Sequence, residues 1–212
     1  QVDPRAGKVL DPASLLDVGQ LQRAYHAGRP DPDQPAQRVI FGTSGHRGSA
    51  FKNTFNEAHI QAIAQAICFD RQARGIDGPL FIGIDTHALS GPAFVTALEV
   101  FVGNGVTTMI DAREGFTPTP AISRAILRYN RDRSRGLADG VIITPSHNPP
   151  ADGGIKYNPP HGGPADAATV GAIERLANQL LAAGLTEVRR IPYERARVSA
   201  EVQLYDYVSP YV

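Results

Sequence analysis

The segment TPSHNPP, residues 144–150, places a hydroxyl, an imidazole and an amide between prolines, directly after an apolar run. Pro145 fixes its own φ, and Pro149 keeps the residue before it out of the helical region. A stiff loop of this kind presents Ser146 in one position, which suits a nucleophile or a covalently modified group. Neighbours in an extended segment point in opposite directions, so His147 is poorly placed to act as the base for Ser146.

Two further segments carry groups that could handle phosphate. GTSGHRG, residues 42–48, offers Ser44, His46 and Arg47 between glycines, which permit close backbone approach to an anion, and arginine can bind phosphate through two donors. GGIKYN, residues 153–158, carries Lys156 on an expected short strand, and a hairpin would return this lysine to the Ser146 loop. Structural roles stay open for all of them: a proline-bracketed turn, a strand-to-helix turn and a solvated lysine.

Alternating apolar segments predict the elements that position these loops. Strands are expected at 38–41, 80–84, 106–110 and 140–143, with a return strand at 154–157. Helices are expected between them, capped by Asn56, Ser90, Thr119 and Asp166 and stopped by glycines such as Gly75 and Gly184. This order predicts an α/β fold with a mainly parallel, mixed sheet sandwiched between helices, and ligands at the carboxyl ends of its strands.

The two ends of the chain lack the regular alternation of predicted strands and helices. Residues 1–37 read as a leader with a short helix and a proline-rich connector, expected to pack on their own domain or on a partner subunit. Residues 38–204 read as one domain. The pattern weakens after Gly184, so the last part is expected to be a linker, with 205–212 opening a second domain.

Composition limits the classes of partner. The chain has 212 residues with 21 Lys and Arg against 21 Asp and Glu, and this zero net charge argues against nucleic acid or an anionic membrane as the main partner. No apolar run approaches the length of a membrane span, and we expect a cytoplasmic protein. Cys68, the single cysteine, lies on an apolar helical stripe and is expected to be buried.

The three segments, in this order and spacing, resemble the amino-terminal domain of the α-D-phosphohexomutases, and most closely their bacterial phosphoglucomutase branch. The resemblance covers about residues 38–205 and implies interconversion of glucose 1-phosphate and glucose 6-phosphate through glucose 1,6-bisphosphate. It makes Ser146 the phosphoryl carrier, Lys156 an acid/base or charge-stabilising group, and His147 and Arg47 catalytic. Ser44, His46, Arg47 and Asn148 would contact the substrate or its phosphate.

The resemblance also implies Mg²⁺, bound through a phosphate oxygen on Ser146 and three aspartates of a D-G-D-x-D-R loop. That loop does not occur in this sequence, so the remaining domains of the same enzyme would have to supply it. The fragment alone is expected to be inactive. The alternatives are a non-catalytic module that binds sugar phosphate or protein, and a serine hydrolase, which is disfavoured because no G-x-S-x-G elbow is present.

Overall fold

The computed structural model describes residues 3–42 and 45–212. The α-helices are α1 Val18–Ala27, α2 Glu57–Ala73, α3 Ser90–Gly103, α4 Thr119–Asn130, α5 Ala167–Ala182 and α6 Tyr193–Ala196. Short 3-10 helices lie at Pro12–Ser14, Pro35–Gln37 and Ala50–Lys52. The strands are β1 His46–Ser49, β2 Leu80–Ile84, β3 Thr108–Asp111, β4 Asp139–Ile143, β5 Asp152–Asn158 and β6 Val202–Tyr205.

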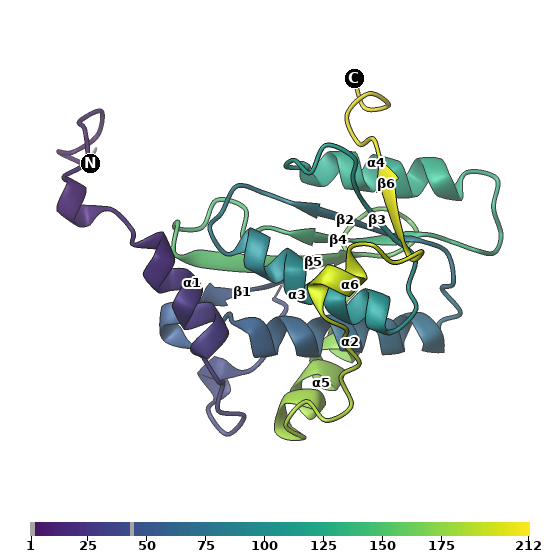
Figure 1. Cartoon of the computed structure of the whole chain (residues 1–212), viewed down its shortest axis with the longest axis horizontal. Helices are drawn as coiled ribbons and strands as arrows, with labels where there is room; N and C mark the ends of the chain where they lie inside the picture. Colours follow the sequence, from purple (N-terminus) through teal and green to yellow (C-terminus); the bar gives the residue numbers. More distant parts are fainter. Residues whose placement is uncertain (1–2, 43–44) are drawn as a thin grey trace.

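The strands form one mixed sheet in the order β1-β5-β4-β2-β3-β6 (Figure 1). The four strands β4, β2, β3 and β6 are parallel, and β5 runs antiparallel to both β4 and β1. Helices α2, α3 and α5 cover one face over the larger apolar core, and α4 covers the other face over a smaller core around Phe81 and Ile122. The expected α/β sandwich is therefore confirmed.

The expected strand at 38–41 is wrong, and its apolar pattern has a different cause. Val39 and Phe41 are buried while Ile40 is exposed, so the alternation of burial is real. Their backbones, however, bond to side chains of α5: Asn178 pairs with both the N–H and the C=O of Val39, and Glu174 accepts from the N–H of Phe41. The segment is held against a helix, and the first strand begins only at His46.

Several helix boundaries follow the expected capping residues and others are displaced by one position. Asn56 and Asp166 cap α2 and α5 through their side chains, as expected. Ser90 and Thr119 are instead the first residues of α3 and α4. Cys68 is buried as expected, and this burial raises the pKa of its thiol to about 12.

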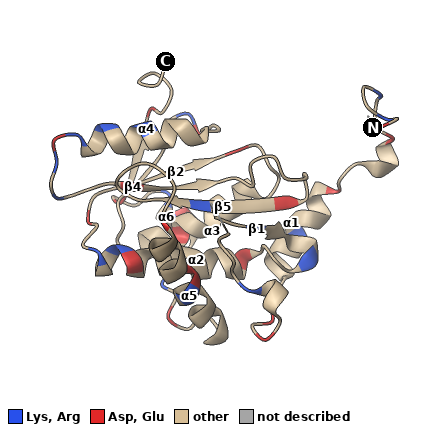
Figure 2. Cartoon of the chain, turned by 180° about the vertical axis from the view of Figure 1, so that it is seen from behind, with Lys and Arg blue, Asp and Glu red and all other residues tan. Residues whose placement is uncertain are grey.

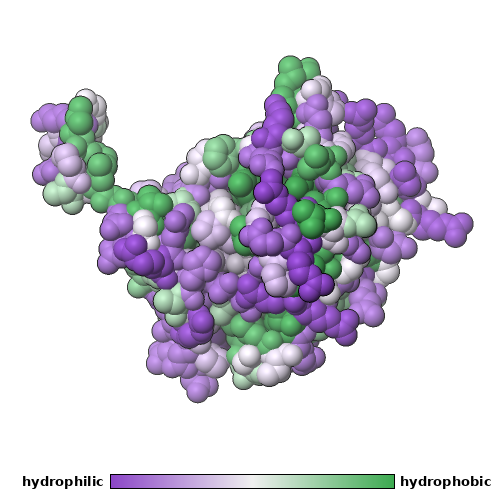
Figure 3. All heavy atoms as spheres, in the orientation of Figure 1, coloured by the Kyte–Doolittle hydropathy of each residue, from purple (hydrophilic) through white to green (hydrophobic). Residues whose placement is uncertain are grey.

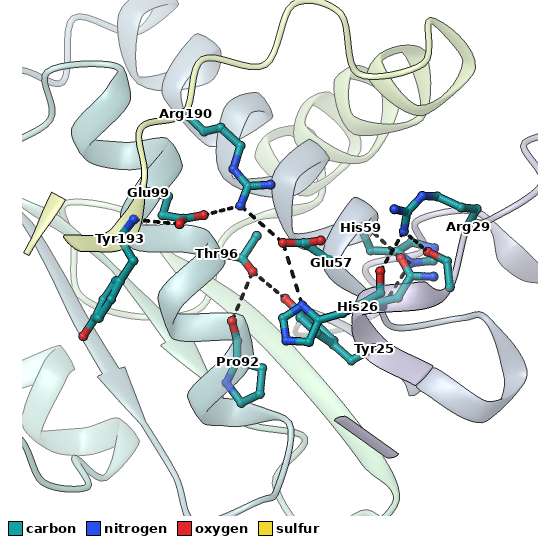
Figure 4. A network of polar contacts seen from close by, with 12 residues as sticks. Tyr25, His26, Arg29, Glu57, His59, Pro92, Thr96, Glu99, Arg190 and Tyr193 are labelled. Carbon is teal, nitrogen blue, oxygen red and sulfur yellow. Dashed lines mark hydrogen bonds and ion pairs between the residues drawn. The ribbon is translucent and has the colours of Figure 1, made fainter. Parts of the chain in front are cut away.

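The leader packs on its own domain through a polar network that Figure 4 shows. Tyr25 of α1 is fully buried, and its hydroxyl bonds to Thr96 Oγ1 of α3 at 2.9 Å. Glu57 of α2 lies 3.3 Å from Arg190, which also pairs with Glu99 of α3. The network thus joins α1, α2, α3 and the segment before α6. Residues 3–14, ahead of α1, extend away from the body of the domain (Figures 1 and 3).

The segment after Gly184 is structured, in contrast to the linker expected there. It forms α6 and then β6, which pairs in parallel with β3. Tyr207 beyond the strand is buried, and its hydroxyl donates to the carbonyl of Met109 at 2.7 Å. The expected domain boundary between 204 and 205 therefore falls inside a strand of this sheet.

Charged residues of both signs are spread over the elements. Figure 2 shows basic and acidic residues dispersed along the elements, in keeping with the equal numbers of the two signs. None of the helices in the described part of the chain is long and apolar enough to cross a membrane.

Candidate active site at the Ser146 loop

The Ser146 loop lies at a position where α/β sheets commonly bind ligands. It follows β4, whose parallel neighbour is β2. The chain leaves β2 toward β3 on one side and leaves β4 toward β5 on the other, so the two connections diverge at their carboxyl ends. In open α/β sheets ligands commonly bind next to the carboxyl ends of strands where such a divergence occurs.

Ser146 has a strained backbone in this loop. Its side chain is exposed, and its φ is 68°, in the left-handed region that residues other than glycine rarely occupy. This conformation costs a serine about 1–2 kcal/mol. The amide of Ser146 donates to Thr144 Oγ1 at 2.8 Å, which helps to hold the turn. The loop thus presents Ser146 in one defined conformation, as the flanking prolines predict.

Lys156 lies beside Ser146, as the expected hairpin requires. β5 returns antiparallel to β4 with Ile142 opposite Lys156, and Lys156 Nζ donates to Ser146 Oγ at 2.7 Å. Partial burial lowers the pKa of Lys156, the nearby Arg47 lowers it further, and Asp85 opposes this shift. An ammonium with a lowered pKa gives up its proton more easily, which is the property that a general acid next to a serine oxygen needs.

Arg47 approaches the same loop from β1. It is half-buried, and its Nε donates to the carbonyl oxygen of Pro145 at 3.2 Å. The register of β1 on β5 puts Arg47 opposite Gly154. A Cβ at Gly154 would lie 2.4 Å from the carbonyl oxygen of Thr144, so only glycine lets β5 pass this close to the loop.

His46 lies away from the Ser146 loop, although the 42–48 segment was expected to bind phosphate through it. It precedes Arg47 on β1, so its side chain points to the opposite face, where it is 2% exposed. Its Nε2 bonds to the carbonyl of Thr54 at 2.9 Å, and its Nδ1 accepts from the amide of Ile40 at 3.2 Å. Burial, aided by nearby His59, lowers the pKa of His46 to about 3. His46 is a neutral residue of the scaffold.

The remaining predicted site residues differ in how closely they approach Ser146. Asn148 is half-buried, and its amide donates to Asp152 Oδ2 at 3.0 Å, which fixes the far side of the loop. His147 is exposed next to Ser146, and Lys156 rather than His147 is the group bonded to the serine oxygen. Ser44 lies outside the described residues. The catalytic and binding roles of these residues stay predictions.

Sequence reasoning missed Asp85 and His87, which follow β2 at the same edge of the sheet. His87 Nδ1 lies 2.8 Å from Asp85 Oδ2, and His87 Nε2 lies 3.2 Å from the carbonyl oxygen of Asn148. Burial would raise the pKa of Asp85, but hydrogen bonds from Ser90, Thr144 and His87 outweigh it and lower that pKa. The sequence signal was available: an Asp-x-His triplet at the end of the strand that neighbours β4.

The described residues do not form a metal site by themselves. They contain no cluster of three His, Cys, Asp or Glu side chains able to hold an ion. A phosphate on the exposed Ser146 would provide a single ligand, fewer than Mg²⁺ requires. The loop offers a serine oxygen that is bonded to an ammonium, with a guanidinium bonded to the residue before the serine, an arrangement suited to accepting and holding a phosphoryl group.

Comparisons with known proteins identify the family to which this chain is related. A family model described as phosphoglucomutase/phosphomannomutase, alpha/beta/alpha domain I, matches residues 38–183. A phosphoglucomutase of Komagataeibacter xylinus is 56% identical over 211 residues, which are 100% of this chain and 38% of that protein. A phosphoglucosamine mutase of Synechococcus sp. (strain WH7803) is 36% identical over 60% of this chain and 24% of its own length.

Solved structures of similar fold carry related names. A putative phosphomannomutase from Thermus thermophilus has a TM-score of 0.59 and 26% identity, covering 84% of this chain and 33% of that one. The Paramecium phosphoglucomutase pp63/parafusin has a TM-score of 0.63 over 86% of this chain and 34% of its own, with 22% identity. This chain thus spans well under half of these relatives. It belongs to the phosphoglucomutase/phosphomannomutase family and contains the family's α/β/α domain I.

Proposed function

We propose that this chain is the phosphoserine domain of a phosphoglucomutase, in which Ser146 carries the phosphoryl group that is exchanged with a hexose phosphate. The observation that carries the proposal is the contact of 2.7 Å between Lys156 Nζ and Ser146 Oγ, in a loop that is strained and exposed. Glucose phosphates are the favoured substrates because the relative that matches the whole chain at 56% identity is a phosphoglucomutase.

The residues divide the transfer between them. A hydroxyl oxygen of the sugar phosphate attacks phosphorus while the bond from phosphorus to Ser146 Oγ breaks, and the sugar hydroxyl passes its proton to a general base that the remaining domains would supply. Lys156 is placed to protonate the departing serine oxygen, and in the return step it takes a proton from Ser146 as that oxygen attacks the bisphosphate. Arg47 adds a permanent positive charge beside the loop, which favours the charged transition state.

The rest of the enzyme must supply what this domain lacks. The family resemblance implies Mg²⁺, for which a phosphate on Ser146 would be one ligand and aspartates outside this chain the others. When bound, the ion would neutralise charge on the transferring phosphoryl group. Sugar recognition would also come from the remaining domains, and we place the enzyme in the cytoplasm. Cell fractionation tests that location.

The proposal is tested by the full-length protein and its Ser146→Ala variant. After incubation with glucose 1,6-bisphosphate, intact mass should show one added phosphate on the wild type and none on the variant. Conversion of glucose 1-phosphate to glucose 6-phosphate should disappear in parallel, whereas a serine hydrolase would instead turn over ester substrates. Normal mutase activity in the Ser146→Ala variant would overturn the carrier role.

A further inference from the structure

The strained turn at Ser146 is tied to β2 on both of its sides, and both ties lead to one carboxylate. On the amino side, the amide of Ser146 donates to Thr144 Oγ1 at 2.8 Å, and the Thr144 side chain lies close enough to Asp85 to lower the pKa of that carboxyl. On the carboxyl side, His87 Nε2 lies 3.2 Å from the carbonyl oxygen of Asn148, and His87 Nδ1 lies 2.8 Å from Asp85 Oδ2.

Asp85 is itself fixed by two more donors. Its Oδ1 accepts from Ser90 Oγ at 2.6 Å, at the first turn of α3, and from the backbone amide of His87 at 3.0 Å. The carboxylate therefore joins the end of β2, the start of α3 and both flanks of the loop. The Asp85 and His87 side chains are part-buried, and hydrogen bonds of this kind restrict the motion of the groups that they connect.

We propose that Asp85 and His87 are positioning residues that hold Ser146 in its left-handed conformation, so that the serine oxygen stays aligned with Lys156 and with the phosphoryl group. Neither residue bonds to Ser146 Oγ; both act through the loop backbone and Thr144. The inference rests on the proposed function, because the alignment matters only if Ser146 exchanges a phosphoryl group. A strained backbone persists only where its surroundings over-determine it, and these two ties are the means.

Three substitutions at His87 separate its two bonds. His87→Gln keeps an amide near the position of Nε2 and can still reach Asn148, His87→Asn keeps only the donor toward Asp85, and His87→Phe keeps the ring and neither bond. In the full-length enzyme we expect kcat to fall about 10- to 100-fold for His87→Phe and His87→Asn, with partial rescue in His87→Gln. KM should stay within about twofold, since uniform binding of the sugar phosphate is unaffected.

Thr144→Val tests the other tie, because it keeps the shape of the side chain and removes the hydroxyl between Ser146 and Asp85. It should lower kcat by a similar factor, and the single-turnover transfer from phosphorylated enzyme to glucose 1-phosphate should slow in parallel. His26→Phe is the matched control: His26 lies on α1 near Glu57, and the substitution should leave kcat unchanged.

The experiments distinguish failure of the positioning role from failure of the proposed function. If the wild-type full-length enzyme shows neither mutase activity nor phosphate on Ser146, the proposed function fails. If the wild type is active and His87→Phe and Thr144→Val match it in kcat, the positioning role is overturned and the function stands. The positioning role would also be rejected if kcat fell equally in all three His87 variants, with no rescue in His87→Gln, and if the fall followed a loss of thermal stability. His87 would then serve folding and not alignment.

Discussion

The two faces of β1 carry neighbouring residues of opposite kind. His46 faces inward, where it bonds to two backbone groups and stacks 5.2 Å from His59, and Arg47 faces the Ser146 loop, where its guanidinium bonds to Pro145. The inward side is buried and neutral, whereas the outward side brings Arg47 to the loop whose exposed serine oxygen is bonded to Lys156. The difference teaches that a motif can divide its residues between scaffold and site according to strand parity alone.

The largest effect should come from the outward side. Lys156→Met keeps the length of the side chain and removes its charge, and in the full-length enzyme kcat should fall about 100- to 10,000-fold. The melting temperature should hardly change, because the ammonium is half-exposed. Steady-state kinetics and thermal unfolding measure the two quantities, with the exposed Lys52→Met as the control. A loss of stability as large as the loss of rate would erase the contrast between the two faces.

Substitution of His46, on the inward side of β1, should lower stability. His46→Phe keeps a ring of similar size but leaves the carbonyl of Thr54 and the amide of Ile40 without their partner. Leaving these part-buried groups without their partner should lower the free energy of unfolding by about 1–3 kcal/mol. Denaturant titration measures it, and His161→Phe in an exposed turn is the control. An unchanged midpoint would contradict the scaffold role.

The stability that His46 contributes should depend on pH. The pKa of His46 is lowered from 6.5 to about 3, so below pH 6.5 the unfolded chain binds a proton that the folded chain does not. Stability due to the neutral ring is complete above pH 6.5 and is lost as pH falls toward 3, by up to about 1.4 kcal/mol per pH unit. The stability gap between wild type and His46→Phe should narrow between pH 7 and 4. A constant gap would mean that His46 is protonated inside the fold.

The smallest effect concerns the strain at Ser146. Glycine adopts its left-handed φ freely, so Ser146→Gly should be more stable than Ser146→Ala by about 1 kcal/mol. Both variants lack the serine oxygen and should be inactive. At Ser134, which does not have a positive φ, the same pair of substitutions should not favour glycine. Equal stability of the two Ser146 variants would show that the turn relaxes once the hydroxyl is removed.

The sequence predicts only those contacts of the site that join residues close together in the chain. Ser146 and Lys156 lie on one hairpin, so stiff prolines and a short return strand were sufficient to bring them together. Asp85 and His87 come from a strand that is adjacent only in space, and no local pattern ties them to Ser146. His46 was misplaced because the position where β1 begins decides which side chain faces the loop.

The fold was predictable wherever apolar periodicity and capping residues agreed. The prediction failed at residues 38–41. Burial alternates there as in a strand, but the backbone bonds to amide and carboxylate side chains of α5 and not to a neighbouring strand. It also failed after Gly184, because the pairing partner of β6 is β3, far away in the chain. Both errors concern backbone partners, which hydrophobic pattern does not specify.

The outermost strand has a practical consequence for anyone trimming this polypeptide. β6 lies beyond residue 183, where the family match ends, yet it shields the rim of β3, and Tyr207 fills a place in the smaller core. A product that stopped at the family boundary would leave the amides and carbonyls of β3 open to strands of other molecules, a common route to aggregation. Expression boundaries are better placed after Tyr207.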